Sequence, residues 1–131
     1  MKPQELRVGN IVKIDDEYLG PIEGKVTSLK ESGEVELLLS VSKGNGRHFV
    51  CGSDDIFPIP ITDELLFKNG FEQCGYIFKT LFIEMYEVEN GWHLHIDNDK
   101  FETAIALTIK HLHHLQNACY LVTGKELEIK L

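Results

Sequence analysis

The sequence predicts an α+β protein: an N-terminal SH3-like small β-barrel, a short hinge helix, and then an antiparallel hairpin sheet packed on a C-terminal helix. Three observations support this class. Five short β segments fall within residues 1–61, Asn90-Gly91 separates two β-rich runs, and apolar residues recur at helical spacing near the C-terminus. We expect two subdomains, an SH3-like β subdomain over 1–61 and an α+β subdomain over 62–131.

The first half is predicted to be a series of short strands. Alternating apolar residues from Leu6 to Ile14 are interrupted by Gly9-Asn10, which indicates a turn or bulge. The last segment contains Pro58 and Pro60, which lack a backbone N–H, so it fits only an edge strand or the exit of a barrel. Many short strands of this kind favour a small SH3-like barrel. The other expected strands cover 25–29, 34–41 and 47–51.

A short hinge helix is predicted over 62–69. Thr62 is a suitable N-cap and is followed by two acidic residues, which the first helical turn favours. Gly70 stands where a left-handed residue ends a helix, and Phe71 can then close over Leu66 in a Schellman-type stop.

A β-hairpin is predicted over 81–97, with Asn90-Gly91 as a two-residue type I′ turn. Alternation then separates a core face from an outer face. The core face carries Ile83, Met85, Trp92, Leu94 and Ile96. The outer face includes Tyr86, Val88, His93 and His95, whose mixed character makes it the candidate surface for binding another protein. Alternatively this face packs on the barrel. Residues 76–79 can add a strand, and 101–107 read as a third strand or as the approach to a helix.

The C-terminal helix is expected from about Ile109 to Thr123, with Thr108 as its cap and Gly124 as its stop. Gln116 lies within the apolar arc and is expected to hydrogen-bond the backbone of the adjoining sheet or loop. Residues 125–131 alternate like a short terminal strand. The apolar arc consists of Ile109, Leu112, Leu115, Cys119 and Val122.

Five histidines lie in the last third of the chain. His93 and His95 have a two-ligand spacing on a strand, and His111 with His114 could offer two more ligands from a helix. No matching carboxylate or cysteine motif accompanies them, so we expect no metal and no cofactor. A metal-dependent hydrolase that uses these C-terminal histidines is kept as an alternative function.

The charge balance disfavours a nucleic-acid partner. Thirteen basic and twenty-one acidic residues give a net charge of -8, which repels phosphate backbones. The one basic loop carries Lys43 and Arg47, and it is read as a hairpin tip or, alternatively, as a weak nucleic-acid-binding loop. The N-terminus lacks the order of a signal peptide, and no apolar run is long enough to span a bilayer. We therefore expect a cytoplasmic protein without a membrane partner.

Several short motifs carry a family resemblance. They are Glu5–Asn10, Ile56–Thr62, Asn69–Phe71, His113–Asn117 and Leu121–Leu127. In these motifs the chain resembles a family of small uncharacterised bacterial proteins with the pattern ELRxGN, PIPLT, HQLQN and LTGEEL, which are often associated with prophages and other mobile elements. The resemblance implies no activity, catalytic residue or cofactor. The chain departs from the pattern at His114, where glutamine is more usual.

His113, Gln116 and Asn117 in this last motif region are interpreted as a polar packing seam or, alternatively, as a recognition surface. The sequence has no GxSxG elbow and no cysteine placed with a histidine partner. We therefore expect a non-enzymatic protein-interaction module, accessory to a mobile element.

Overall fold

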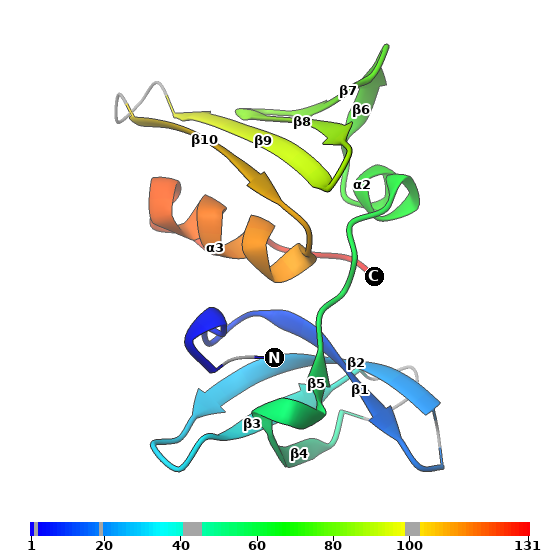
Figure 1. Cartoon of the computed structure of the whole chain (residues 1–131), viewed down its shortest axis with the longest axis vertical. Helices are drawn as coiled ribbons and strands as arrows, with labels where there is room; N and C mark the ends of the chain where they lie inside the picture. The colour runs from blue at the N-terminus through cyan, green and yellow to red at the C-terminus, as the bar shows by residue number, and fades with distance from the viewer. Residues whose placement is uncertain (2, 19, 41–45, 99–102) are drawn as a thin grey trace. The chain divides into compact units, whose positions relative to one another are not determined.

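The computed structural model describes residues 1, 3–18, 20–40, 46–98 and 103–131 (Figure 1). The protein is an α+β chain with two five-stranded antiparallel sheets and a C-terminal helix, as the sequence predicted at this level. It divides into two compact units, Met1–Ile59 and Pro60–Leu131, and each has its own sheet. In the described part of the chain, no helix has the length and apolar character needed to cross a membrane.

The first unit is a five-stranded meander with the order β4-β3-β2-β1-β5. The buried side chains of this unit form a hydrophobic core that includes Val12, Ile22, Leu37 and Ile56. Its elements are the 3₁₀ turn η1 (Pro3–Glu5), β1 (Ile11–Asp16), β2 (Gly20–Leu29), β3 (Glu34–Leu39), β4 (His48–Gly52), the 3₁₀ turn η2 (Ser53–Asp55) and β5 (Ile56–Phe57).

The pairings among the described residues leave this sheet open, so the expected closed barrel is not seen. Strands β4 and β5 are its two edges. Only Ile56 and Phe57 of β5 pair with β1, because Pro58 follows directly and has no N–H to extend the ladder. The predicted edge strand is thus confirmed only for Ile56–Phe57, and the two prolines lie outside it.

A turn interrupts the chain near Gly9-Asn10, as predicted, but its central residues are Val8 and Gly9, and it is closed by the fully buried Asn10. Asn10 accepts a hydrogen bond from the Arg7 N–H through Oδ1 at 2.8 Å. Its carbonyl accepts one from Val26 at 2.9 Å, and Gly9, with a φ of 100°, donates to the Val26 carbonyl. The Glu5–Asn10 motif therefore has a structural role, since it ties the N-terminal turn to the middle of β2.

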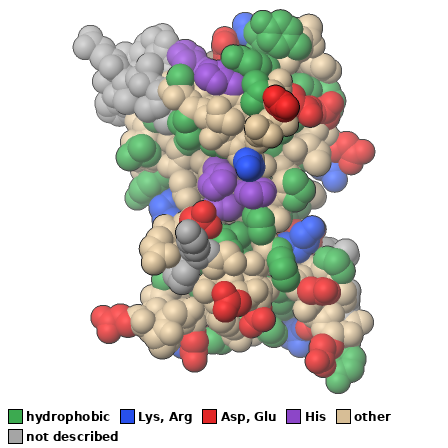
Figure 2. Space-filling model, in the orientation of Figure 1, with side chains coloured by type: hydrophobic (Ala, Val, Ile, Leu, Met, Phe, Trp, Pro, Cys, Tyr) green, Lys and Arg blue, Asp and Glu red, His purple; other side chains and the backbone are tan. Residues whose placement is uncertain are grey.

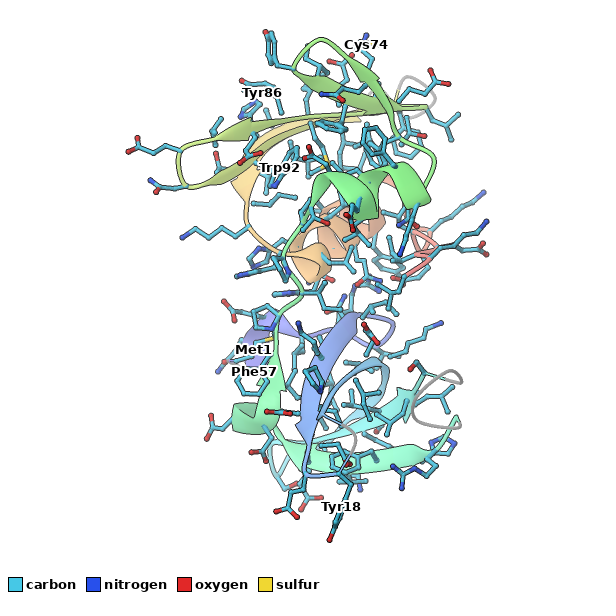
Figure 3. The ribbon with its side chains drawn as sticks, turned by 90° about the vertical axis from the view of Figure 1, so that its right-hand side faces the viewer. Met1, Tyr18, Phe57, Cys74, Tyr86 and Trp92 are labelled. Atoms are coloured by element: carbon cyan, nitrogen blue, oxygen red, sulfur yellow. The ribbon has the colours of Figure 1, made fainter. Side chains whose placement is uncertain are left out.

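The second unit is another antiparallel meander, with the order β10-β9-β8-β7-β6. Helix α3 contacts β9 and β10. The elements of this unit are α2 (Asp63–Lys68), β6 (Glu72–Cys74), β7 (Ile77–Thr80), β8 (Ile83–Val88), β9 (Gly91–Asn98), β10 (Thr103–Ile109) and α3 (Leu112–Thr123). The predicted core face is confirmed, because all five of its residues are buried. Figure 3 shows Trp92 on this face and Tyr86 on the opposite one.

Helix α2 begins and ends as its sequence predicted. The Thr62 hydroxyl accepts a hydrogen bond from the Leu65 N–H at 3.2 Å. At the other end Gly70 has a φ of 83°, and the Phe71 N–H donates to the Leu66 carbonyl at 3.0 Å, which is the Schellman arrangement.

The hairpin between β8 and β9 has the predicted faces but not the predicted turn. Val88 pairs with Gly91, so the chain reverses at Glu89-Asn90 rather than at Asn90-Gly91. Gly91 takes the positive φ of 148° as the first residue of β9, and a Cβ there would overlap the carbonyl oxygen of Ile109. The change moves the pairing by two residues, which leaves every side chain on its predicted face.

Two boundaries near the C-terminus differ from the prediction. Residues up to Ile109 remain in β10, where Ile109 pairs with Trp92, so α3 starts later than expected and is capped by His111 instead of Thr108. Residues 125–131 are not a strand. Asn69 holds this tail instead, because its amide accepts from the Lys130 N–H at 2.6 Å and donates to the Lys130 carbonyl at 2.8 Å.

Candidate functional site at the junction of β10 and α3

The candidate site lies where the edge strand β10 turns into helix α3. His111 has extended backbone angles (φ −130°, ψ 158°) and serves as the N-cap residue, so it is not part of the helical turn that follows. Its carbonyl accepts the first helical hydrogen bond from His114, and its backbone bridges to Pro60. Three histidines are therefore placed around one tight reversal of the chain.

His111, His113 and His114 form a compact cluster at this reversal. Each offers one ring nitrogen, and these three atoms lie within 4.8 Å of one another. The ring centroids are 5.8 Å apart for His111 and His113, 5.3 Å for His111 and His114, and 4.2 Å for His113 and His114. In Figure 2, histidine side chains form a compact group near the centre of the view, apart from other histidines near the top. Within the described residues, this is the only grouping of three metal-ligand side chains.

The members of the cluster differ in burial. His113 is only 1% exposed, whereas His111 and His114 are half-buried. The Nδ1 atom of His114 accepts a hydrogen bond from the Lys110 N–H at a long 3.4 Å. The cluster thus has one imidazole fixed inside the protein and two that solvent can reach.

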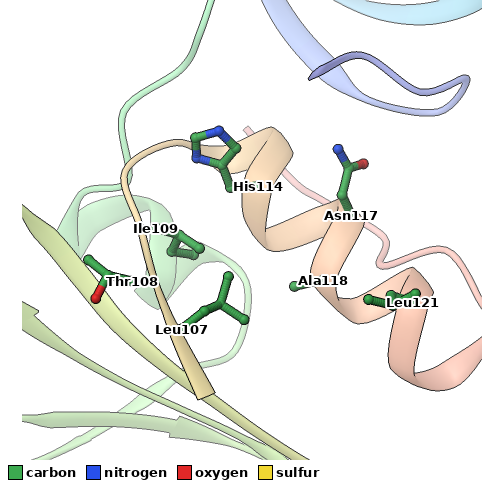
Figure 4. A pocket seen from close by; sticks show the side chains of 7 residues that line it. All are labelled: Leu107, Thr108, Ile109, His114, Asn117, Ala118 and Leu121. Atoms are coloured by element: carbon green, nitrogen blue, oxygen red, sulfur yellow. The ribbon is translucent and has the colours of Figure 1, made fainter. Parts of the chain in front are cut away.

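A pocket of about 330 Å³ lies beside the cluster, between β10 and α3. Leu107 shares a face with Leu94, and Ile109 shares one with Trp92, so both point toward the core side of the sheet. Leu107 is nevertheless 37% exposed, because it lies on the edge strand. Figure 4 shows the lining side chains, which are Leu107, Thr108, Ile109, His114, Asn117, Ala118 and Leu121.

The segment that supplies the lining of this pocket has almost no charge. Although 26% of the chain is charged, the segment 103–123 contains a single Lys, Arg, Asp or Glu, which is Lys110. Leu121 on α3 is 78% exposed, and Tyr120 beside it is also exposed. Interface centres are depleted of charged residues in this way.

The face predicted to bind a partner lies elsewhere, on the side of the sheet opposite the core. Tyr86, Val88, His93 and His95 are all half-buried on β8 and β9. The Tyr86 and His93 rings are 4.9 Å apart, and Tyr76 packs edge-on against Tyr86 at 5.7 Å. His93 and His95 do not belong to the three-histidine cluster.

The residues of the predicted polar seam are divided between core and surface. His113 and Gln116 are both 1% exposed, while Asn117 is half-buried and lines the pocket. The predicted hydrogen bond from Gln116 to the backbone stays a prediction. In the basic loop, Arg47 is exposed just before β4, and Lys43 lies outside the described residues.

Sequence reasoning paired His111 with His114 and left His113 out of any metal site. On a continuous helix, residues two positions apart point in nearly opposite directions, so His111 and His113 would not meet. They meet because His111 is extended at the N-cap. A helix start placed at Leu112, with His111 as the extended N-cap, would have brought the three together.

Comparisons with protein-family models, with curated proteins and with solved structures return no significant match for this chain.

Proposed function

We propose that the protein is a non-enzymatic interaction module that captures an extended segment of another protein as an additional strand beside β10. The observation that carries the proposal is the edge strand β10, which contains no charged residue and lies next to an apolar pocket.

The edge of β10 is suited to strand addition. It pairs with β9 on one side, and among the described residues no strand lies on its other side. Natural edge strands are usually protected from such pairing by charged residues, prolines or bulges. The seven residues Thr103–Ile109 contain no charge and no proline, and their pairing with β9 continues without a bulge. Main-chain hydrogen bonds to this edge would supply affinity.

The pocket defines what the added segment must contain. Directly opposed residues of neighbouring strands have side chains on the same face, about 4.5–5.5 Å apart. Alternate side chains of an added strand would therefore lie on the same face of the sheet as Leu107, and the one opposite Leu107 would point toward Ala118 and Leu121 of α3. The occupant is an extended segment with apolar residues at alternate positions and without charge at its centre.

The test is a selection of displayed short random peptides on the purified protein, followed by NMR mapping of the selected peptide. We expect alternating apolar residues in the selected sequences and amide shifts in Leu107–Ile109. Leu121→Glu places a charge at the pocket and should weaken binding at least tenfold, by roughly 1.4 kcal/mol or more.

Leu81→Glu is the matched control, because Leu81 is 97% exposed and stands in the turn between β7 and β8. It should bind the peptide as the parent does. The proposal fails if no peptide is enriched, if Leu121→Glu binds normally, or if the shifts fall on the face of Tyr86 and His93.

Two finer interpretations belong to the same proposal. We propose that the first unit is related to SH3-like folds, which is supported by its strand order and by the 3₁₀ turn η2 between β4 and β5. We also propose that the module is accessory to a mobile element, and the support for this is the sequence resemblance alone.

A further inference from the structure

We propose that His111, His113 and His114 form a binding site for a divalent first-row transition metal, with Zn²⁺ as the ion of choice. Coordination of a metal by imidazoles uses different interactions from the proposed capture of a peptide by main-chain hydrogen bonds and apolar contacts. The inference rests on the closeness of the three ring nitrogens, on the donor type and on the burial of the cluster.

The three ring nitrogens need to move only slightly closer together to bind one metal ion. Zn–N bonds of about 2.0–2.1 Å in a tetrahedron put ligand nitrogens roughly 3.3 Å apart. The three nitrogens already lie within 4.8 Å. His113 is held inside the protein, so rotation of the half-buried His111 and His114 side chains toward it can close the remaining gap.

The donors select the class of metal. Three imidazoles without a carboxylate or thiolate in the group suit Zn²⁺, Cu²⁺ or Ni²⁺, whereas Mg²⁺ and Ca²⁺ need oxygen ligands. Neutral ligands leave the full charge of the ion in place. The first turn of the 12-residue helix α3 adds partial positive charge there, so the fourth position should take water or a small anion.

The surroundings give the site a reporter. Binding at either nitrogen of His114 conflicts with the Lys110 N–H, because Nδ1 must then either coordinate the metal or carry the proton itself. The 3.4 Å hydrogen bond from Lys110 is long and is expected to break when metal binds. The amide of Lys110 should therefore shift on metal addition.

The experiment is titration of chelator-treated protein with ZnCl₂, followed by calorimetry, and with CoCl₂, followed by visible absorption. We expect one ion per chain, tetrahedral Co²⁺ bands without a thiolate charge-transfer band, and a shifted Lys110 amide. His111→Ala and His114→Ala should each weaken Zn²⁺ binding by more than the roughly 10–100-fold that loss of an outer-shell partner costs. Both side chains are half-buried, so these variants should remain folded, which circular dichroism can verify.

The matched control is the double variant His93→Ala/His95→Ala, which removes two histidines from β9 and should bind Zn²⁺ like the parent. The proposal is overturned if the protein binds no Zn²⁺, if the His111 and His114 variants bind it normally, or if the β9 double variant abolishes binding. A thiolate charge-transfer band would likewise overturn it, since it would assign the ion to a cysteine.

Discussion

Replacement of Gly91 by alanine should destabilise the second unit more than alanine at its other glycines of positive φ, which are Gly70, Gly75 and Gly124. Gly91 has a φ of 148°, which side chains rarely adopt, and the added Cβ would overlap the Ile109 carbonyl oxygen and lie 3.2 Å from Cγ of Lys110. The oxygen belongs to the backbone of β10 and cannot rotate away. The paired ends of β9 and β10 would therefore have to separate.

Two costs contribute to this prediction. A strained backbone angle costs about 1–3 kcal/mol, and forcing an extra carbon into a packed place costs about 1–3 kcal/mol more, so we expect about 2–6 kcal/mol in total. A domain of this kind has roughly 5–15 kcal/mol of stability altogether. The variant should lose a large part of it.

Urea unfolding followed by tryptophan fluorescence measures this loss, because Trp92 is the single tryptophan and lies next to Gly91. Gly124→Ala is the control, since Gly124 has a φ of 71° but nothing lies within 4 Å of the added Cβ. It should cost only the left-handed strain of about 1–2 kcal/mol. Equal losses for the two variants would show that the contact with Ile109 does not matter.

Two other predictions concern the tail and the buried thiol. Asn69→Ala removes both hydrogen bonds to Lys130, so hydrogen exchange at the Lys130 amide should accelerate and stability should fall by about 1–3 kcal/mol; unchanged exchange would contradict the role given to Asn69. Burial, and to a smaller extent the negative charge of Glu126, raises the pKa of the Cys119 thiol from 9.0 to about 12. Iodoacetamide should therefore label the exposed Cys74 quickly and Cys119 only on unfolding. Because the folded state keeps this proton more tightly than the unfolded chain, the stability that depends on it should be complete below pH 9 and be lost as the pH rises to about 12. Cys119→Ala should remove that part of the pH dependence.

Local signals predicted the local structure well. Thr62, Gly70 and Phe71 define α2 through hydrogen bonds between residues close in the chain, so the sequence contains all that is needed. The alternation of Met85, Trp92 and Leu94 fixed the core face even though the turn was misplaced by one residue, because a two-residue change of register conserves the faces.

Long-range contacts decided the rest. The tail 125–131 alternates like a strand, but its partner is the side chain of Asn69, which is distant in the sequence. Ile109 has helical spacing with Leu112, yet its backbone pairs with Trp92 and remains in β10. Pairings of this kind depend on which segments meet, and a single sequence does not record that.

The sequence by itself determined the α+β class, an edge strand that ends before Pro58, the caps of α2 and the residues that form the core of the hairpin. Each of these follows from backbone geometry or burial within a few residues. Only the tertiary structure decided the candidate sites. The pocket needs β10 and α3 side by side. The cluster needs His111 extended at the N-cap, because on a continuous helix its ring would lie near His114 but not near His113.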